Sequence, residues 1–278
     1  MVAQLNAIEV PARGGGPEKV GFILHGILGS AKNWRSFSRR LASTYPGWRW
    51  YLVDLRNHGE SPKGQSPHTL KACANDLVVL AERLGVIPEV VIGHSFGGKV
   101  AMQYAVQSPA GLRCTWVLDT NPAPAQTDAR RISSTNVVQV FRALKAVPQP
   151  LSSREELVAF LLDRGFARVL ADWMTTNLRR DEDGFRWRFD LPGVAEMVDS
   201  YTQADFFETL SGAKHGGAVE LVRAEWTEWP EGDRGRLSAM DEDMSLPFSY
   251  HILAGSGHWV HVERPNELIE MLGRTLEG

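Results

Sequence analysis

Residues 90–98 read VVIGHSFGG, and this stretch decides the fold. The three β-branched residues at its start predict a buried strand, and the small residues after them predict a sharp turn. The pattern Gly93-x-Ser95-x-Gly97 between a strand and a helix is typical of a nucleophile elbow, in which a serine hydroxyl stands at the apex of the turn. The next residues, KVAMQYA, suit a helix. The sequence therefore supplies the strand, turn and helix that the motif requires.

Apolar runs and amphipathic segments alternate around this turn. Buried strands are expected at 19–24, 50–55 and 115–118, and helical spacing of apolar residues occurs at 32–44 and 69–84, with Gly85 suited to end the second helix. Strands that alternate with helices predict βαβ units, which give a parallel sheet with helices on both faces. Continuously apolar strands agree with a sheet covered on two sides. We expect an α/β protein with a doubly wound, mostly parallel sheet.

The pattern changes near residue 126. From there to about 212 no strand-like run occurs, and four segments carry apolar residues at helical spacing: 137–144, 154–162, 166–177 and 194–210. Strand signals return at 219–224 and 250–254, and an amphipathic helix closes the chain at 265–276. We expect a core of residues 1–125 and 212–278, with a helical cap of residues 126–211 inserted after the sixth strand. About half of the cap's aromatic residues should line an apolar pocket between cap and sheet. These residues are Phe166, Trp173, Phe185, Trp187, Phe189, Tyr201, Phe206 and Phe207.

Composition excludes several classes of protein. The 278 residues are 43% hydrophobic and 23% charged, and the net charge of −3 argues against a nucleic-acid partner. Two cysteines are too few for a disulfide framework, and no apolar run is long enough for an integral membrane segment. We expect a cytoplasmic or organellar protein (mitochondrion or plastid), with any targeting segment absent from this chain, and not a secreted one. Its oligomeric state stays open.

Four polar residues follow the ends of expected strands: His25, Ser95, Asp119 and His258. Ligands of open parallel sheets bind at the carboxyl ends of the strands, so these side chains should gather at one edge. A serine hydroxyl needs a base to become a nucleophile, and imidazole is the usual one. His258 lies in a glycine-flanked loop after the last strand and fits the chain order serine, acid, histidine. We expect Ser95 to be the nucleophile and His258 the base, while His25 braces its own loop.

Two regions compete to supply the acid that orients the imidazole. Asp119 ends the strand after the nucleophile helix and precedes a proline-rich loop, which would hold it rigidly. Glu225 and Glu228 flank tryptophans in the loop after strand 219–224, as surface residues often do. Spacing favours Asp119.

The developing oxyanion of an acyl-transfer transition state needs preorganised N–H donors. The residue after the nucleophile, Phe96, offers one backbone N–H, and the loop His25-Gly26-Ile27 offers another, that of Ile27. Histidine and cysteine spacings match no metal-ligand pattern. We therefore expect no metal and no cofactor.

Four motifs together resemble the α/β-hydrolase fold, and in particular its branch of small esterases that includes α/β-hydrolase domain-containing protein eleven and bacterial relatives. The resemblance covers nearly the whole chain and implies hydrolysis of carboxylic esters or thioesters, with Ser95 as nucleophile and His258 as base. In some bacterial members the acid position matches Asp119, whereas the more usual position falls near Thr227 or Glu228. The acid stays open between Asp119 and Glu228. The motifs are HGILGS (25–30), DLRNHGESP (54–62), GHSFGGKVAM (93–102) and GHWVHVERP (257–265).

The leading hypothesis is a serine hydrolase that acts on esters or thioesters of apolar acyl groups through an acyl-enzyme intermediate, with a small-molecule substrate. Two alternatives use the same residues. One is a small-ligand receptor of this fold with little turnover, and the other is an acyltransferase. The sequence does not separate them.

Overall fold

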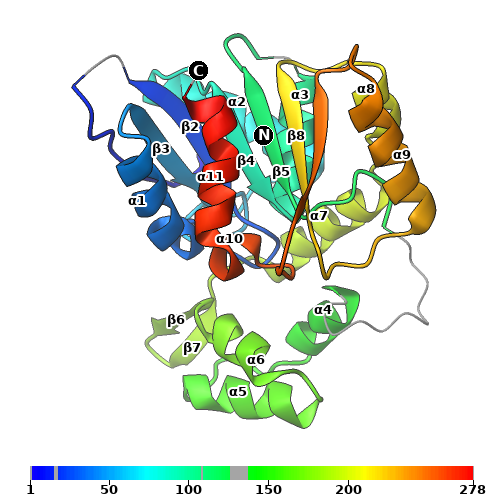
Figure 1. Ribbon diagram of the computed structural model, residues 1–278. Coiled ribbons are helices and arrows are strands. Elements are labelled where there is room, and N and C mark those ends of the chain that lie inside the picture. Colours follow the sequence, from blue (N-terminus) through cyan, green and yellow to red (C-terminus); the bar gives the residue numbers. More distant parts are fainter. Residues whose placement is uncertain (1, 16–17, 108, 126–136, 278) are drawn as a thin grey trace.

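The computed structural model of the chain describes residues 2–15, 18–107, 109–125 and 137–277 (Figure 1). The strands of its central sheet are β1 Ala7–Val10, β2 Lys19–Leu24, β3 Trp48–Val53, β4 Val90–His94, β5 Cys114–Leu118, β8 Ala218–Ala224 and β9 Phe248–Leu253. They lie in the order β1-β3-β2-β4-β5-β8-β9. β1 pairs antiparallel with β3, and the pairs from β3 through β9 are parallel. The expected mostly parallel sheet is confirmed.

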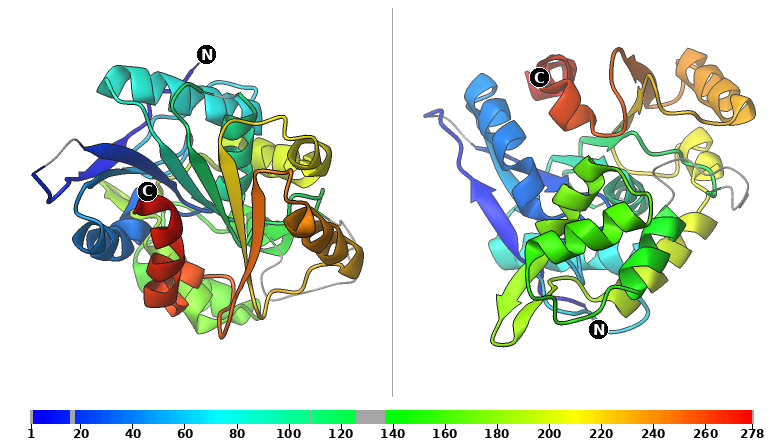
Figure 2. Two further views of the ribbon diagram at one scale, coloured as in Figure 1. Left: turned by 45° about the horizontal axis from the view of Figure 1, so that its top comes forward. Right: turned by 90° about the horizontal axis from the view of Figure 1, so that it is seen from below.

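Helices cover both faces of this sheet (Figure 2). Successive strand residues point to opposite faces, so Val91 packs in one hydrophobic core and Ile92 in the other. α1 and α11 cover the face of Ile92, while α2, α3 and α9 pack on the face of Val91. No helix in the described ranges is long and apolar enough to cross a membrane. The core helices are the 3-10 helix η1 Ala31–Trp34, α1 Arg35–Thr44, α2 Leu70–Leu84, α3 Phe96–Val106, α9 Glu231–Glu242, α10 Val260–Glu263 and α11 Pro265–Leu276.

The ends of α2 show how local sequence sets an element. The hydroxyl of Thr69 accepts a hydrogen bond from the N–H of Ala72 at 3.2 Å and caps the first turn. Gly85 ends the helix with φ 65°, a left-handed conformation that glycine adopts without a steric penalty. The expected helix over 69–84 and its glycine stop are confirmed.

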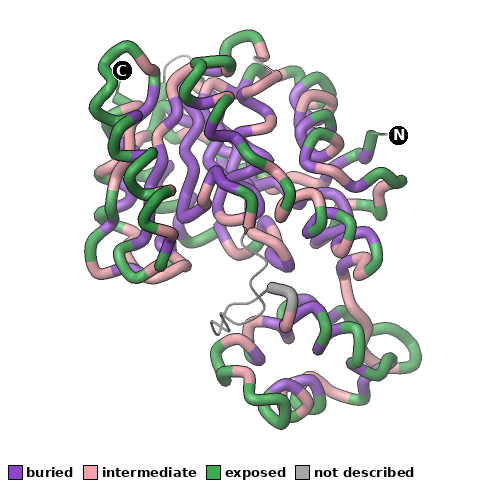
Figure 3. The backbone as a smooth tube through the Cα atoms, turned by 90° about the vertical axis from the view of Figure 1, so that its right-hand side faces the viewer, coloured by how far each residue is buried: buried purple, intermediate pink, exposed green. Residues whose placement is uncertain are grey.

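The segment between β5 and β8 extends beyond the carboxyl ends of the strands (Figures 1 and 3). Its first elements form a lobe over that edge of the sheet, while α7 packs beside α2 and α3. We call the lobe of described residues 137–187 the cap. The elements of the segment are α4 Val137–Lys145, α5 Arg154–Asp163, α6 Arg168–Thr175, β6 Leu178–Asp181, β7 Gly184–Trp187, α7 Leu191–Gln203 and α8 Phe207–Ser211.

Two expectations about this segment were wrong. It is not wholly helical, because β6 and β7 form an antiparallel hairpin. Only Leu178 of β6 is buried and its other residues are exposed and charged, so the hairpin carries no apolar run that would signal strands. The segment also follows the fifth strand in chain order rather than the sixth, since the five strands β1 to β5 precede α4. Residues 126–136, where the cap was expected to begin, lie outside the described residues.

Candidate active site

Ser95 occupies the turn between β4 and α3 with φ 53° and ψ −119°. This positive φ is rare for a residue with a side chain, and it lifts the serine out of both elements. Two glycines make the turn possible. A Cβ atom on Gly93 would overlap the carbonyl of Gly97, and one on Gly97 would lie 2.6 Å from the carbonyl O of His25. The Gly-x-Ser-x-Gly spacing thus has a steric cause here.

His258 follows β9 and lies beside the end of β5. Its Nδ1 is 2.7 Å from Oδ2 of Asp119, and the Asp119 side chain is fully buried while 31% of the His258 side chain is exposed. Because a carboxylate only accepts, the imidazole proton lies on Nδ1, which leaves Nε2 free to take a proton.

Asp119 is held by further hydrogen bonds from the neighbouring strand end. The N–H of Ala224 donates to Oδ1 at 3.0 Å, and the hydroxyl of Thr227 donates to Oδ2 at 2.8 Å. These donors fix the orientation of the carboxylate. The rival acid Glu228 is exposed and makes no hydrogen bond within the described part of the chain. The last residue of β8 therefore brings an N–H to the site and the loop after β8 brings a hydroxyl, and the geometry favours Asp119 over Glu228.

Two backbone N–H groups near Ser95 have no acceptor among the described residues. One belongs to Ile27, in the turn from Gly26 to Gly29 that follows β2. The other belongs to Phe96, the first residue of α3, where a helix leaves its N–H groups unpaired. Both residues were expected as oxyanion donors, and both N–H groups are available for that role.

Four further histidines surround this edge of the sheet in buried positions. His25 Nδ1 donates to the carbonyl of Gly26 at 2.7 Å, and its Nε2 accepts from Leu55 N–H at 3.0 Å, so it braces its loop as expected. Burial lowers the pKa of His25, and it lowers the pKa of His58 and His261 to about 3. These imidazoles are neutral at pH 7 and serve the site through their fixed hydrogen bonds and packing.

His94 is a contributor that the sequence did not reveal. Its Nε2 donates to the backbone carbonyl of His258 at 2.7 Å, and the two rings lie 4.6 Å apart between centroids. Burial holds the pKa of His94 well below its ordinary value, and repulsion from the protonated forms of nearby histidines, His258 first, lowers it further. Its ring supports the loop that carries His258.

A cavity of about 570 Å³ opens above Ser95 and His258. Ile27, Leu28 and Trp259 form part of its core side. On the cap side, the ring of Trp173 lies 6.5 Å from that of Trp259 between centroids. Among the described lining residues, histidines aside, Glu263 alone is ionisable. The cavity suits an uncharged apolar group. Its cap-side residues are Val140, Val169, Leu170 and Trp173.

The expectation that half of the aromatic set would line this cavity was wrong. Of those eight residues Trp173 alone is among the described lining residues. Three of the others are buried in the hydrophobic core: Phe189, Phe206 and Phe207. The ring of Trp187 stacks on that of Phe189, with 4.9 Å between the ring centroids. Aliphatic side chains take the places expected for aromatic ones.

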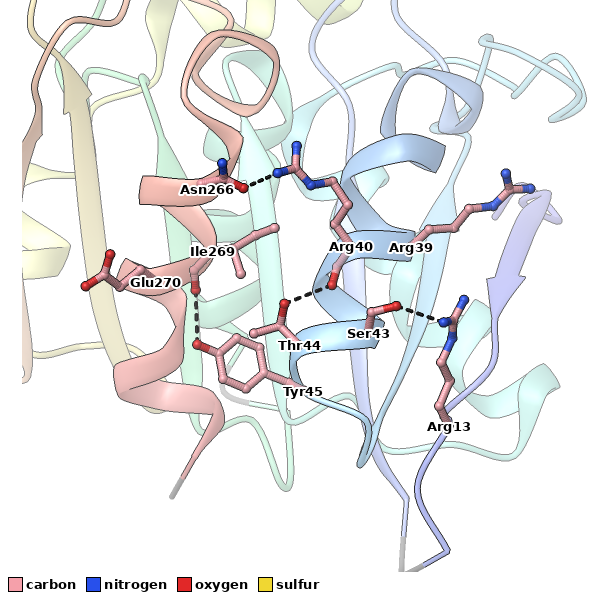
Figure 4. A pocket seen from close by; sticks show the side chains of 9 residues that line it. All are labelled: Arg13, Arg39, Arg40, Ser43, Thr44, Tyr45, Asn266, Ile269 and Glu270. Atoms are coloured by element: carbon pink, nitrogen blue, oxygen red, sulfur yellow. Dashed lines mark hydrogen bonds between the residues drawn. The ribbon is translucent and has the colours of Figure 1, made fainter.

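A second open cavity, of about 620 Å³, lies between α1 and α11, away from Ser95 (Figure 4). Arg13 donates to the hydroxyl of Ser43 at 2.8 Å, and Arg40 donates to the side-chain oxygen of Asn266. Its described lining contains no histidine or cysteine. It therefore lacks the imidazole that is the usual base for a serine nucleophile. No group of three or more metal-ligating side chains occurs within the described ranges.

Comparison with known proteins relates the chain to esterases and lipases. It is 28% identical over 256 residues to the "sn-1-specific diacylglycerol lipase ABHD11" of Mus musculus, covering 89% of this chain and 77% of that protein. It is 27% identical over 259 residues to "Esterase YbfF" of Escherichia coli (strain K12), covering 91% of each. The solved structure of a "Marine microorganism esterase" matches the fold with a TM-score of 0.80 at 24% identity, covering 99% of both chains.

The family model described as "Alpha/beta hydrolase family" matches residues 22–271. This range includes the elbow, both candidate oxyanion donors and the loops that carry Asp119 and His258. The expected resemblance is thereby confirmed, and the chain belongs to the alpha/beta hydrolase family.

Proposed function

We propose that this protein is a serine hydrolase that cleaves carboxylic esters or thioesters of apolar acyl groups through an acyl-enzyme intermediate. One observation carries the proposal. The buried carboxylate of Asp119 binds Nδ1 of His258 at 2.7 Å, at the same cavity that Ser95 lines. A buried carboxylate, an imidazole that it orients and a serine at the same cavity are the groups that nucleophilic acyl transfer uses.

In the first half of the reaction, Oγ of Ser95 attacks the acyl carbonyl carbon, and Nε2 of His258 takes the hydroxyl proton of Ser95. The carbonyl oxygen becomes an anion and accepts hydrogen bonds from the N–H groups of Ile27 and Phe96. The tetrahedral intermediate then collapses, and His258 gives its proton to the departing alcohol or thiol. Ser95 is left as an ester of the acyl group.

In the second half, water replaces the leaving group. His258 takes a proton from the water as it attacks the acyl-enzyme, and the same two N–H groups stabilise the second oxyanion. Collapse returns the proton to Ser95 and releases the acid. Asp119 stays ionised throughout and stabilises the imidazolium form of His258.

The walls of the cavity support an apolar acyl group. Val169, Leu170 and Trp173 offer apolar surface, and Glu263 would repel an anionic acyl chain. The relatives named as a lipase and an esterase agree with ester chemistry.

The test is labelling with a fluorophosphonate, which reacts with activated serines, together with turnover of p-nitrophenyl esters and acyl thioesters of increasing chain length. We expect labelling of the wild type, none of Ser95→Ala, and at least about a 10³-fold loss of turnover in that variant. Ser43→Ala, which alters an exposed serine of the second cavity, should label and turn over normally.

Equal labelling of Ser95→Ala would contradict the proposal. Wild-type turnover below about one per hour would favour a ligand receptor, since enzymes usually reach about 1 to 10³ per second. Ester products formed with added alcohols would favour an acyltransferase.

A further inference from the structure

The turn that carries Ile27 contains an unfavourable backbone conformation. The N–H of Gly29 donates to the carbonyl of Gly26 at 3.0 Å and closes a four-residue turn. Leu28 is the third residue of this turn and has φ 60°. Turns with a positive φ at that position strongly favour glycine or asparagine there. A leucine needs outside support to stay in this conformation.

Two buried hydrogen bonds supply that support, one on each backbone polar group of Leu28. Its N–H donates to Nε2 of His58 at 3.1 Å. Its carbonyl accepts from Nδ2 of Asn177 at 2.8 Å. Nδ1 of His58 donates to the carbonyl of Arg56 at 2.9 Å, which leaves Nε2 as an acceptor. Burial keeps His58 neutral, since it lowers its pKa to about 3.

Asn177 comes from the cap, where it lies between α6 and β6. Its side chain is buried, with 4% of the residue exposed. Its own backbone is fixed, because its N–H donates to the carbonyl of Met174 at 3.1 Å and its carbonyl accepts from the N–H of Arg188 at 2.8 Å. The bond to Leu28 therefore joins a rigid point of the cap to the turn that carries Ile27.

We propose that Asn177 is a positioning residue through which the cap sets the oxyanion-binding N–H of Ile27. By holding the carbonyl of Leu28, it keeps the Gly26–Gly29 turn in the form that leaves the adjacent Ile27 N–H without an internal acceptor. The proposal rests on the hydrolase function proposed for Ser95. It gives the cap a part in the chemical step in addition to contact with the acyl group.

The test is Asn177→Leu, which keeps nearly the same shape and removes the donor. A lost oxyanion donor costs about 10²- to 10³-fold in kcat, and a displaced one should cost less, about 10- to 100-fold. KM for a short ester should stay within about threefold, because the donor acts mainly on the transition state. A boronic acid forms a tetrahedral adduct with an activated serine, and its affinity should fall by the same factor as kcat/KM.

The matched control is Thr176→Val. Thr176 is the neighbouring cap residue, is exposed, and donates its hydroxyl to the carbonyl of Trp173 at 2.7 Å without touching the turn. We expect this variant to keep wild-type kcat and boronate affinity. Thermal unfolding of each variant checks that the chain is folded.

A kcat for Asn177→Leu within about twofold of wild type, or an unchanged boronate affinity, would overturn the proposal. If that variant does not fold, Asn177→Ser is measured in the same way, and failure of both to fold would assign Asn177 to stability alone and also overturn it. Ser95→Ala separates the two proposals. Turnover that survives in Ser95→Ala defeats the hydrolase function, whereas its loss together with normal Asn177→Leu kinetics defeats only the role of Asn177.

Discussion

The core side and the cap side of the active cavity are built on different principles. On the core side, polar groups such as Asp119 and His94 are buried and carry fixed hydrogen bonds at strand ends. On the cap side, Val169, Leu170 and Trp173 offer apolar surface, and Val169 is 67% exposed. Directional bonds fix atoms to within fractions of an ångström, whereas apolar contacts tolerate movement. The directional hydrogen bonds, which include the one from Asn177 of the cap, should therefore control rate, and the apolar side chains of the cap should control which acyl group enters.

The sharpest test of the core side is Asp119→Asn. The asparagine side chain carries no charge to stabilise an imidazolium, and it favours the His258 tautomer whose proton is not on Nδ1. We therefore expect kcat to fall about 10⁴-fold. KM should change little. The matched variant Glu228→Gln, on the exposed acid of the next loop, should stay within about twofold of wild type. Steady-state kinetics on one ester measures both. A large loss in Glu228→Gln with a small one in Asp119→Asn would move the acid to the loop after β8.

The core side should also make the protein sensitive to acid. His58 and His261 have pKa values of about 3 when folded, against 6.5 for the exposed side chain. Between these values the unfolded chain holds a proton at each site and the folded chain does not. The free energy of unfolding therefore falls as pH falls from 6.5 towards 3, by about 1.4 kcal/mol per pH unit for each histidine. Urea unfolding at pH 7, 6 and 5 measures this slope.

The variant His261→Phe should lower the slope of the unfolding free energy against pH by the contribution of one histidine, about 1.4 kcal/mol per pH unit. The ring of His261 stacks on Trp34 with centroids 3.8 Å apart, so phenylalanine can keep the contact while it removes the titration. Nδ1 of His261 has no hydrogen-bond partner in the described part of the chain, so its loss strands no polar group. An unchanged slope in this variant would mean that His261 is protonated in the folded protein as readily as in the unfolded one.

Much of the core could be predicted from the sequence because its signals are local. The run of residues 90–92 and the glycines around Ser95 lie within a few residues of each other, and steric requirements act at that range. His258 was predicted from chain order and its glycine-flanked loop. Gly85 stops α2 for a reason confined to one residue, its positive φ.

The remaining features depend on contacts between distant residues. Thr227 binds Asp119 and Asn177 binds Leu28 across more than 100 residues of sequence, and nothing near either residue signals its partner. The sequence predicts only that Lys99 lies in a helix. In the structure Lys99 is buried and donates hydrogen bonds to three backbone carbonyls, those of Ala123, Tyr201 and Ala204. Hydrophobicity predicts that a side chain is buried, but it does not predict which other residues that side chain contacts. The misjudged aromatic lining has the same cause.

The smallest expected effect tests the cap side. Trp173→Ala removes apolar surface from the cavity, and partial burial of an acyl chain against a tryptophan is worth about 1 to 2 kcal/mol. We expect KM for a medium-chain ester to rise about tenfold with kcat within about threefold, and KM for an acetate ester to change little. A panel of p-nitrophenyl esters from acetate to decanoate measures this selectivity.

The control for this variant is Trp226→Ala, because Trp226 is 65% exposed and lies outside the cavity lining. It should leave the whole panel unchanged. A loss of kcat in Trp173→Ala equal to that expected for Asn177→Leu would mean that apolar contacts of the cap also align the reacting atoms. In that case rate and selectivity would not divide between the directional hydrogen bonds and the apolar contacts of the cavity. A uniform rise in KM across the panel would instead mean that the acyl chain leaves Ser95 in a direction away from Trp173, along the core wall beside Trp259.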